Sequence, residues 1–304
     1  MARPFLAKPD CIPCALRQVL STTRRVSDDP WFHAKVLKKV MADLSECDMA
    51  RSAAEVSFEA LRSAAAYMGT ADPYAEEKRK HNAVVKGILP DLRRRIGEST
   101  DPLGLAARLA IAGNMIDLGV LSEVDVFGAI DRAVSEPLAI DDLPALREGA
   151  RAARSVLYVL DNAGEIALDG LFIEQLKRKE VTCLVRAAPV LNDATREDAE
   201  EAGLGGFCAI LDPGTPMLGL VLGLASAEVA ERFEKADLVI AKGQANFETL
   251  CGSDREIFFL LNAKCKIVAD ELGVPLGAAV LLQREPAHPP TAAGKKLPAQ
   301  PPAP

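Results

Sequence analysis

Apolar residues recur at intervals of three and four over much of the first 150 residues. This spacing places them on one face of an α-helix, and the segments are rich in Ala, Leu, Arg and Glu, which favour helix. The pattern predicts helices over residues 31–45, 52–67, 76–95, 103–118 and 125–134. Residues 1–150 are therefore expected to form an all-helical domain.

The pattern changes after residue 154, where short apolar runs alternate with helix-like segments. The runs predict strands over 155–160, 181–185, 207–211 and 238–241, with helices over 165–178, 194–202 and 226–235. Residues 257–261 and 266–268 are expected to supply a further strand. Strands that alternate with helices form parallel sheets covered on both faces. The fold class predicted for residues 151–285 is thus α/β, a three-layer α/β/α Rossmann-like arrangement with a mostly parallel sheet. Residues 286–304 contain seven prolines and no apolar periodicity, which predicts a disordered tail.

Charge is distributed unevenly along the chain. The whole sequence carries 36 Lys and Arg against 43 Asp and Glu, but residues 101–285 alone hold 17 basic and 30 acidic side chains. An acidic body argues against nucleic acid as a partner, because binding phosphate backbones needs a dense basic surface. It is compatible with an oxygen-rich site for a divalent cation.

Other features bear on location. No apolar run is long enough to span a membrane, and the N-terminus lacks the apolar core of a signal peptide. The seven cysteines are scattered and odd in number, which favours a reducing cytoplasm over a disulfide framework. The oligomeric state is left open by the sequence.

A polar group follows each of the four predicted strands. In an open parallel sheet, ligands bind beyond the carboxyl ends of the strands near the topological switch point. Asp161 and Asn162 follow the first strand, Asp193 comes after the second, Asp212 follows the third and Lys242 follows the fourth. Two carboxylates and a carboxamide form a hard oxygen site of the kind that Mg²⁺ or Mn²⁺ prefers, and a lysine can neutralise a phosphate. The alternative is that each Asp or Asn only caps a helix or forms a turn.

The same loops argue against several enzyme classes. The sequence contains no G-x-G-x-x-G, no Walker-type phosphate loop and no G-x-S-x-G elbow. The paired aspartates of haloacid-dehalogenase-type phosphatases are also missing, since Asp161 is followed by Asn162 and Ala163.

Longer motifs resemble a known family. The stretch DNAGE at 161–165, Pro189 with Asn192-Asp193, and KGQANFE at 242–248 are similar to motifs of the damage-control phosphatases. That family was formerly catalogued as domain of unknown function 89 and is also called acidic-residue-methyltransferase-like. Three N-terminal stretches resemble it too: the Cys-x-x-Cys at 11–14, which marks a prokaryotic subfamily, DPY at 72–74 with Lys78, and GNMID at 113–117. The resemblance covers residues 8–285.

The resemblance implies a metal-dependent phosphatase that hydrolyses phosphate monoesters of small metabolites, such as sugar phosphates or damaged cofactor precursors. It also implies Mn²⁺, Mg²⁺, Ni²⁺ or Co²⁺ as cofactor, and an active site between the helical and α/β parts. By position, the metal ligands would be Asp161, Asn162 and Asp193, and the catalytic residues would be Asp161, Asp193 and Lys242. Substrate would be bound by Asn114, Asp117, Glu165, Asn246 and Glu248.

Two questions stay open at this point. Water could attack phosphorus with Asp161 or Asp193 orienting it, or Asp161 could itself be the nucleophile. The function could also be that of a non-catalytic metabolite-binding protein or of an S-adenosylmethionine-dependent carboxyl methyltransferase, although the glycine-poor first loop gives the latter little support.

Four further side chains have simpler interpretations. Cys11 and Cys14 either ligate metal, act as a redox pair or pack at a helix start. We expect Trp31 in the core or in a hydrophobic staple and His81 on a solvated helix face.

Overall fold

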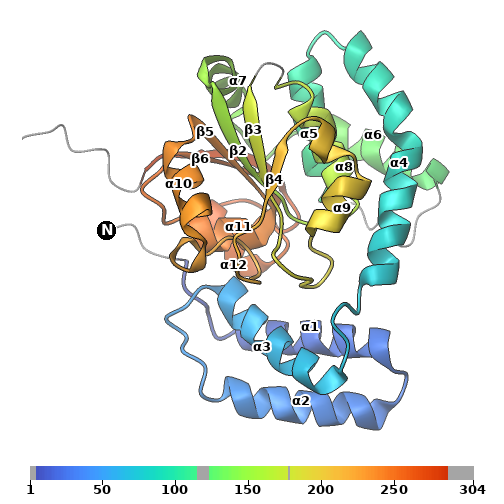
Figure 1. Ribbon diagram of the computed structural model, residues 1–304, viewed down its shortest axis with the longest axis vertical. Helices are drawn as coiled ribbons and strands as arrows, with labels where there is room; N and C mark the ends of the chain where they lie inside the picture. The colour runs from blue at the N-terminus through green and yellow to red at the C-terminus, as the bar shows by residue number, and fades with distance from the viewer. Residues whose placement is uncertain (1–4, 115–122, 177–178, 287–304) are drawn as a thin grey trace, which may run out of the picture.

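The computed structural model describes residues 5–114, 123–176 and 179–286. Asp117 and residues 287–304 of the tail expected at 286–304 therefore lie outside the described residues. Helices and strands alternate through the second half of the chain (Figure 1). The helices are α1 (Cys11–Val26), α2 (Pro30–Leu44), α3 (Ala53–Met68), α4 (Ala75–Glu98), α5 (Pro102–Gly113), α6 (Glu123–Ser135), α7 (Leu143–Ala152), α8 (Ile166–Ile173), α9 (Arg196–Glu201), α10 (Ala227–Lys235), α11 (Gly243–Leu250) and α12 (Lys266–Leu272). The strands are β1 (Ile140–Asp141), β2 (Ser155–Val159), β3 (Glu180–Leu184), β4 (Ala209–Leu211), β5 (Leu238–Lys242), β6 (Ile257–Asn262) and β7 (Ala279–Arg284).

Seven strands form one sheet in the order β1-β7-β6-β5-β2-β3-β4. All neighbouring pairs are parallel except β6 with β7. From β2 the chain runs outward to β3 and β4, then returns to the other side of β2 with β5. The topological switch point therefore lies between β2 and β5, where a ligand crevice is expected.

Helices cover both faces of the sheet (Figure 1). One apolar core unites residues of α4–α8 with the side chains on one face of the sheet, among them Tyr158 and Ile240. A second core lies between the opposite face and α10–α12 and includes Val159 and Phe259. The strands that both cores share are apolar and buried on both sides, as crossover helices require. The predicted α/β class with a mostly parallel sheet is confirmed.

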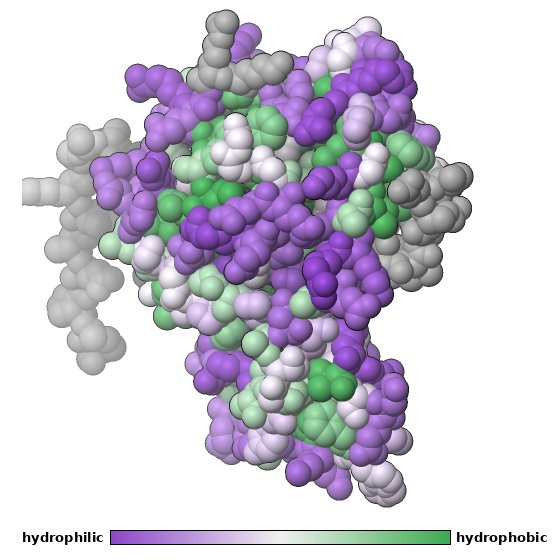
Figure 2. All heavy atoms as spheres, turned by 45° about the vertical axis from the view of Figure 1, so that its right-hand side comes forward, coloured by the Kyte–Doolittle hydropathy of each residue, from purple (hydrophilic) through white to green (hydrophobic). Residues whose placement is uncertain are grey.

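Helices α1–α3 form a separate group below the sheet, joined to the rest through the start of α4 (Figure 1). The space-filling view shows this group as a narrower lobe, and polar side chains cover much of the visible face of the body (Figure 2). Helix α3 begins with a capping box between Ser52 and Glu55 and ends at Gly69, which has a φ of 68°. Helices α4–α7 share an apolar core with the sheet, although α4–α6 lie wholly before residue 150. The domain boundary expected at residue 150 stays a prediction.

Three local predictions are wrong. Residues 266–268 begin helix α12 rather than a strand. Trp31 is 83% exposed, because α2 buries its other face, with Val36, Val40 and Leu44. His81 is only 6% exposed, since it shares the buried face of α4 with Lys78 and Val85. Apolar periodicity locates a helix but identifies its buried face poorly where that face carries polar residues.

Candidate functional site

The predicted polar loops meet at the switch point of the sheet. Asp161 follows β2, Asp193 lies in the loop after β3, and Lys242 is the last residue of β5. Backbone hydrogen bonds join the first two loops: the Ala163 amide donates to the Asn192 carbonyl at 2.8 Å, and the Ala194 amide donates to the Asp161 carbonyl at 2.8 Å. These two bonds form an isolated antiparallel bridge between Asn162 and Asp193, beyond the parallel pairing of β2 with β3, and hold Asp161 close to Asp193.

Asp161 is 5% exposed and is surrounded by donors. Its Oδ2 accepts from the side-chain amides of Asn114 and Asn162, each at 2.9 Å. Its Oδ1 lies 3.6 Å from Nη2 of Arg186. Asn114 follows the end of α5, so a residue of the first 150 does reach this site.

Glu165 adds a second carboxylate to the same group. Its Oε1 accepts from the side-chain amides of Asn114 at 3.1 Å and Asn162 at 2.9 Å, and from the Asn162 backbone at 2.8 Å. Its Oε2 is buried, has no hydrogen-bond partner among the described residues, and lies 3.9 Å from the ammonium of Lys242.

Asp193 is paired with a buried arginine. Nε of Arg186 donates to Asp193 Oδ2 at 2.6 Å, and both side chains are 3% exposed. Arg186 also donates to the Asn246 side chain at 3.4 Å. Arg186 thus contacts both predicted aspartate ligands, although the sequence pattern did not single it out.

These carboxyls are electrostatically crowded. Burial, together with the charges of Asp193 and Glu165, raises the pKa of Asp161 to about 7, against the opposing effect of Lys264 and Arg186. Burial also raises the pKa of Asp193, even though Arg186 opposes the shift. Three carboxylates and one guanidinium leave a net charge of −2 when all are ionised, so among the described residues Arg186 balances only part of the negative charge of this group.

Lys242 has a different environment from the one expected of a phosphate contact. Its side chain is fully buried, and Nζ donates to Asp169 Oδ1 at 2.7 Å and to the Ala110 carbonyl at 2.8 Å. Tyr158 donates to the same carboxylate oxygen at 2.8 Å. Burial raises the pKa of Asp169 to about 6 despite this pairing. Lys242 therefore joins β5 to α5 and α8 beneath the site.

Asn246 and Glu248 lie on α11. Asn246 donates to the carbonyls of Leu160 at 3.1 Å and Lys242 at 2.7 Å, and accepts from the Leu220 amide at 2.9 Å. Asn246 thus fastens α11 to the end of β2. Glu248 accepts from Gln244 at 2.9 Å, and burial raises its pKa to about 7. Its further partner is the backbone of Ala54 in α3, so Glu248 lies at the contact between the helical lobe and the body.

Lys264 is an exposed lysine that could take the role expected of Lys242, contact with a phosphate. It follows β6, its backbone amide donates to Gln244 Oε1 at 3.0 Å, and its charge lowers the pKa of both Asp161 and Asp193. Its position just beyond the carboxyl end of a buried strand was a signal in the sequence. By contrast, Asp212 accepts from the Gly214 amide at 3.0 Å and forms a turn, as the simpler alternative proposed.

A buried polar network supports the site from α4. Asn82 accepts from the Gly164 amide at 2.6 Å and donates to Asp198 Oδ1 at 3.2 Å. Lys78 bridges Asp198 at 3.1 Å and Asp72 at 2.9 Å. The family-like motif at 72–78 thus connects the base of the helical lobe to the loops that carry Asp161 and Asp193.

Gly243 allows β5 to approach the site closely. It has a φ of 77°, and a Cβ at this position would lie 1.9 Å from Asp161 Oδ2. Any side chain would therefore displace the carboxylate of Asp161 or the first turn of α11.

We expect Gly243→Ala to lower the turnover of a phosphate ester by about a hundredfold or more if the predicted catalytic role of Asp161 holds, because displacing a catalytic group by a small distance has an effect of this size. Initial rates and circular dichroism would measure the loss and confirm that the fold is retained. Gly203→Ala is the matched control, since Gly203 also has a positive φ, of 77°, but has open space around its Cβ position. Equal losses in the two variants would show that backbone strain, not the contact with Asp161, is responsible.

The donor set suits a divalent metal. Among the described residues, no three His, Cys, Asp or Glu side chains are arranged to hold an ion, and the predicted set comprises two carboxylates and an amide. These are hard oxygen donors and they carry excess negative charge. Beside them Asn114 Oδ1 is buried and has no partner within the ranges that the structure describes. The residues present therefore fit such an ion.

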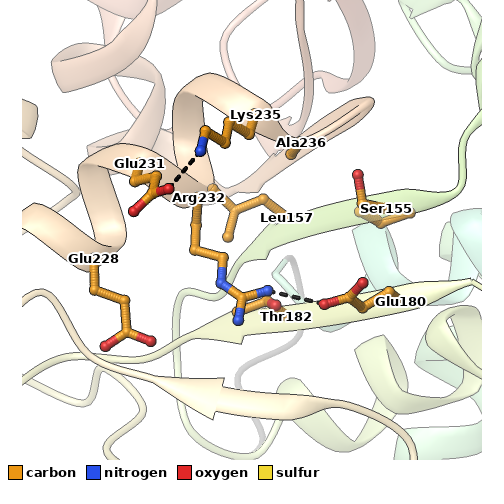
Figure 3. A pocket seen from close by; sticks show the side chains of 10 residues that line it. Ser155, Leu157, Glu180, Thr182, Glu228, Glu231, Arg232, Lys235 and Ala236 are labelled. Atoms are coloured by element: carbon orange, nitrogen blue, oxygen red, sulfur yellow. Dashed lines mark hydrogen bonds and ion pairs between the residues drawn. The ribbon is translucent and has the colours of Figure 1, made fainter.

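A hollow of about 430 Å³ lies away from this site, near the amino ends of β2 and β3 (Figure 3). Two of its basic side chains are paired with carboxylates, Arg232 with Glu180 at 3.0 Å and Lys235 with Glu231 at 2.5 Å. None of the predicted site residues lines it. In parallel sheets this end of the strands is the one away from ligands.

The fold and the site define an α/β protein with a buried group of carboxylates at the switch point of its sheet. A family model, the damage-control phosphatase ARMT1-like domain, matches residues 7–280. A damage-control phosphatase of Pyrococcus horikoshii is 39% identical over 224 residues, which cover 72% of this chain and 77% of that protein. A damage-control phosphatase of Archaeoglobus fulgidus is 34% identical over 281 residues, covering 90% and 97% of the two chains. The crystal structure of a DUF89 family protein from P. horikoshii superposes with a TM-score of 0.87 at 32% identity, covering 92% of this chain and 99% of that one.

The chain belongs to the damage-control phosphatase family. The predicted family and the predicted enzyme class, a phosphatase, are therefore confirmed. In the described part of the chain, no helix is both long and apolar enough to span a membrane.

Proposed function

We propose that the protein is a metal-dependent phosphatase that hydrolyses phosphate monoesters of small, damaged metabolites. The observation that carries the proposal is the buried group of Asp161, Glu165 and Asp193, whose negative charge Arg186 only partly balances. Excess negative charge at a switch point favours the binding of a divalent cation, and such an ion supplies the positive charge that phosphate chemistry needs.

Asp161, Asn162 and Asp193 are the residues that would hold the ion. When bound, it would supply positive charge to the phosphate oxygens and so favour phosphoryl transfer. Arg186 fixes the orientation of Asp193 through the 2.6 Å hydrogen bond. Lys264, the exposed lysine after β6 whose charge acts on both aspartates, binds the phosphate. Lys242 supports β5 through its ion pair with Asp169.

The attacking water is oriented by one of the two aspartates. An ionised carboxylate within reach of the water can take up its proton as the water attacks. The new P–O bond forms from water while the ester P–O bond breaks, and the departing alcohol takes up a proton.

Phosphate release from p-nitrophenyl phosphate tests the proposal. We expect release with Mn²⁺ or Mg²⁺, a loss of about a hundredfold or more after chelation, and recovery when metal is returned. Full activity in the presence of chelator would contradict metal dependence. No activity with any of the four predicted metals would contradict the proposed chemistry.

Lys264→Ala is expected to lower kcat/KM for the same ester by about tenfold or more, because one charged contact to phosphate is lost. The thermal midpoint should stay unchanged, since Lys264 is exposed. Lys266→Ala is the matched control, because Lys266 is exposed, lies two residues away and pairs with Asp270 at 2.8 Å. An equal loss in both variants would point to a general effect of surface charge.

A further inference from the structure

A second hollow, of about 220 Å³, lies between the helical lobe and the loop after β3. Its walls come from α3, from the connection between α3 and α4, and from residues 188–191 and 216. Its apolar lining includes Phe58, Leu61, Ala65, Pro189, Leu191 and Pro216. None of these residues has a part in the chemistry proposed above.

The polar side chains around this hollow are already bound to one another or to neighbours. Thr22 and Tyr74 share a hydrogen bond of 3.0 Å. Arg62 pairs with Glu59 at 2.6 Å, and Asp72 pairs with Lys78 at 2.9 Å. A ligand group in the hollow would therefore contact mainly apolar side chains. A hydroxyl-rich group placed there would lose hydrogen bonds to water without replacing them.

The hollow is close to the predicted metal ligands. Leu191, on its wall, precedes Asp193 by two residues, so their Cα atoms are at most about 8 Å apart. Leu191 has a φ of 50°, in the left-handed region that side chains rarely adopt, and the next residue, Asn192, accepts from the Ala163 amide of the Asp161 loop at 2.8 Å. One short segment thus forms both the wall of the hollow and the link between the two ligand-bearing loops.

We propose that this hollow binds the apolar substituent of the phosphate ester that the enzyme hydrolyses. The inference rests on the proposed function and narrows its substrate class. The preferred substrates carry a short alkyl or aryl group next to the phosphate, rather than a chain of hydroxyls. The phosphate lies at Asp161 and Asp193 while the substituent extends along residues 188–191 toward α3.

Ethyl, butyl and hexyl phosphate provide the test. All three are primary alkyl esters with similar leaving groups, so differences in kcat/KM report binding of the chain. Each methylene buried in an apolar site is worth about fourfold. We expect kcat/KM to rise by about tenfold or more from ethyl to hexyl phosphate.

A variant that fills the hollow shows whether the alkyl chain binds there. Ala65→Phe, on the wall formed by α3, should flatten the dependence on chain length. Ala42→Phe, at an exposed position of α2 outside this hollow, should leave it intact. General damage to the enzyme lowers all three rates together and leaves the ratio of hexyl to ethyl unchanged.

The outcomes separate the two proposals. Failure to hydrolyse any ester would overturn the proposed function, and the pocket with it. Hydrolysis of all three esters with equal kcat/KM would overturn only the proposal that the hollow binds the substituent. A preference for hexyl phosphate that survives in Ala65→Phe would also overturn it, since the chain would then bind elsewhere.

Discussion

Asp161→Asn is expected to lower phosphate release by about a thousandfold or more and, in the absence of metal, to make the fold more stable at pH 8. The loss of activity follows because the substitution removes the carboxylate that is predicted both to hold the ion and to orient water. The gain in stability follows because the same carboxylate is buried beside Glu165 and Asp193 without a full set of cations.

The pH dependence of this effect has a definite sign. The pKa of Asp161 is raised from 3.8 to about 7 on folding, so between these values the folded state binds more protons than the unfolded state. The free energy of unfolding of the metal-free protein must then fall as pH rises from about 4 to 7. Glu248 and Asp169, whose pKa values burial raises to about 7 and about 6, contribute in the same direction.

Thermal denaturation at pH 5 and pH 8 with chelator present measures the effect. Wild type should be less stable at pH 8, and Asp161→Asn should recover about 2 kcal/mol there. Asp28→Asn, at an exposed position, is the control. An Asp161→Asn variant that is less stable than wild type at pH 8 would mean that the carboxylate stabilises the metal-free fold.

Lys242→Ala is expected to destabilise the protein by about 3 to 5 kcal/mol, because it leaves Asp169 buried without its partner. The alternative, drawn from the sequence, is that Lys242 contacts phosphate, in which case the variant would fold normally and show a raised KM. Chemical denaturation and steady-state kinetics on the same sample distinguish the two.

A double variant makes this test sharper. Lys242→Met with Asp169→Asn removes both charges, keeps an acceptor for the Tyr158 hydroxyl and retains most of the side-chain volume. We expect it to recover much of the stability lost in Lys242→Ala, since the lone buried charge is gone. If Asp169→Asn adds to the loss instead, the two side chains do not act as a pair.

The sequence predicted where Asp161 and Lys242 lie in the fold, but it did not predict what surrounds Lys242. The apolar runs located β2, β3 and β5, and parallel strands bring the residues after them to one edge of the sheet. Asp161, Asn162 and Asp193 were therefore brought together in prediction and lie together in the structure. Their roles as ligands remain predictions.

The contacts of a side chain were harder to predict than its position in the fold. The burial of Lys242 depends on Asp169 and on the Ala110 carbonyl of α5, which lies 132 residues away in the chain. Arg186 gave no signal because a single arginine after a strand is compatible with many roles. The paired edge of β1 and β7 was missed because β1 has only two residues and so carries no periodicity.

That edge has a consequence for how the chain acquires its structure during synthesis. β1 pairs with β7, so the segment at 140–141 must wait until residues 279–284 have left the ribosome before the sheet can close. β6 pairs antiparallel with the same late strand along six residues. Contacts between such distant segments form slowly, and strands that wait unpaired are prone to associate with other chains. The pairing of β7 with β1 and β6 thus completes the sheet only at the end of synthesis. We expect nascent chains that stop before residue 279 to stay bound to chaperones.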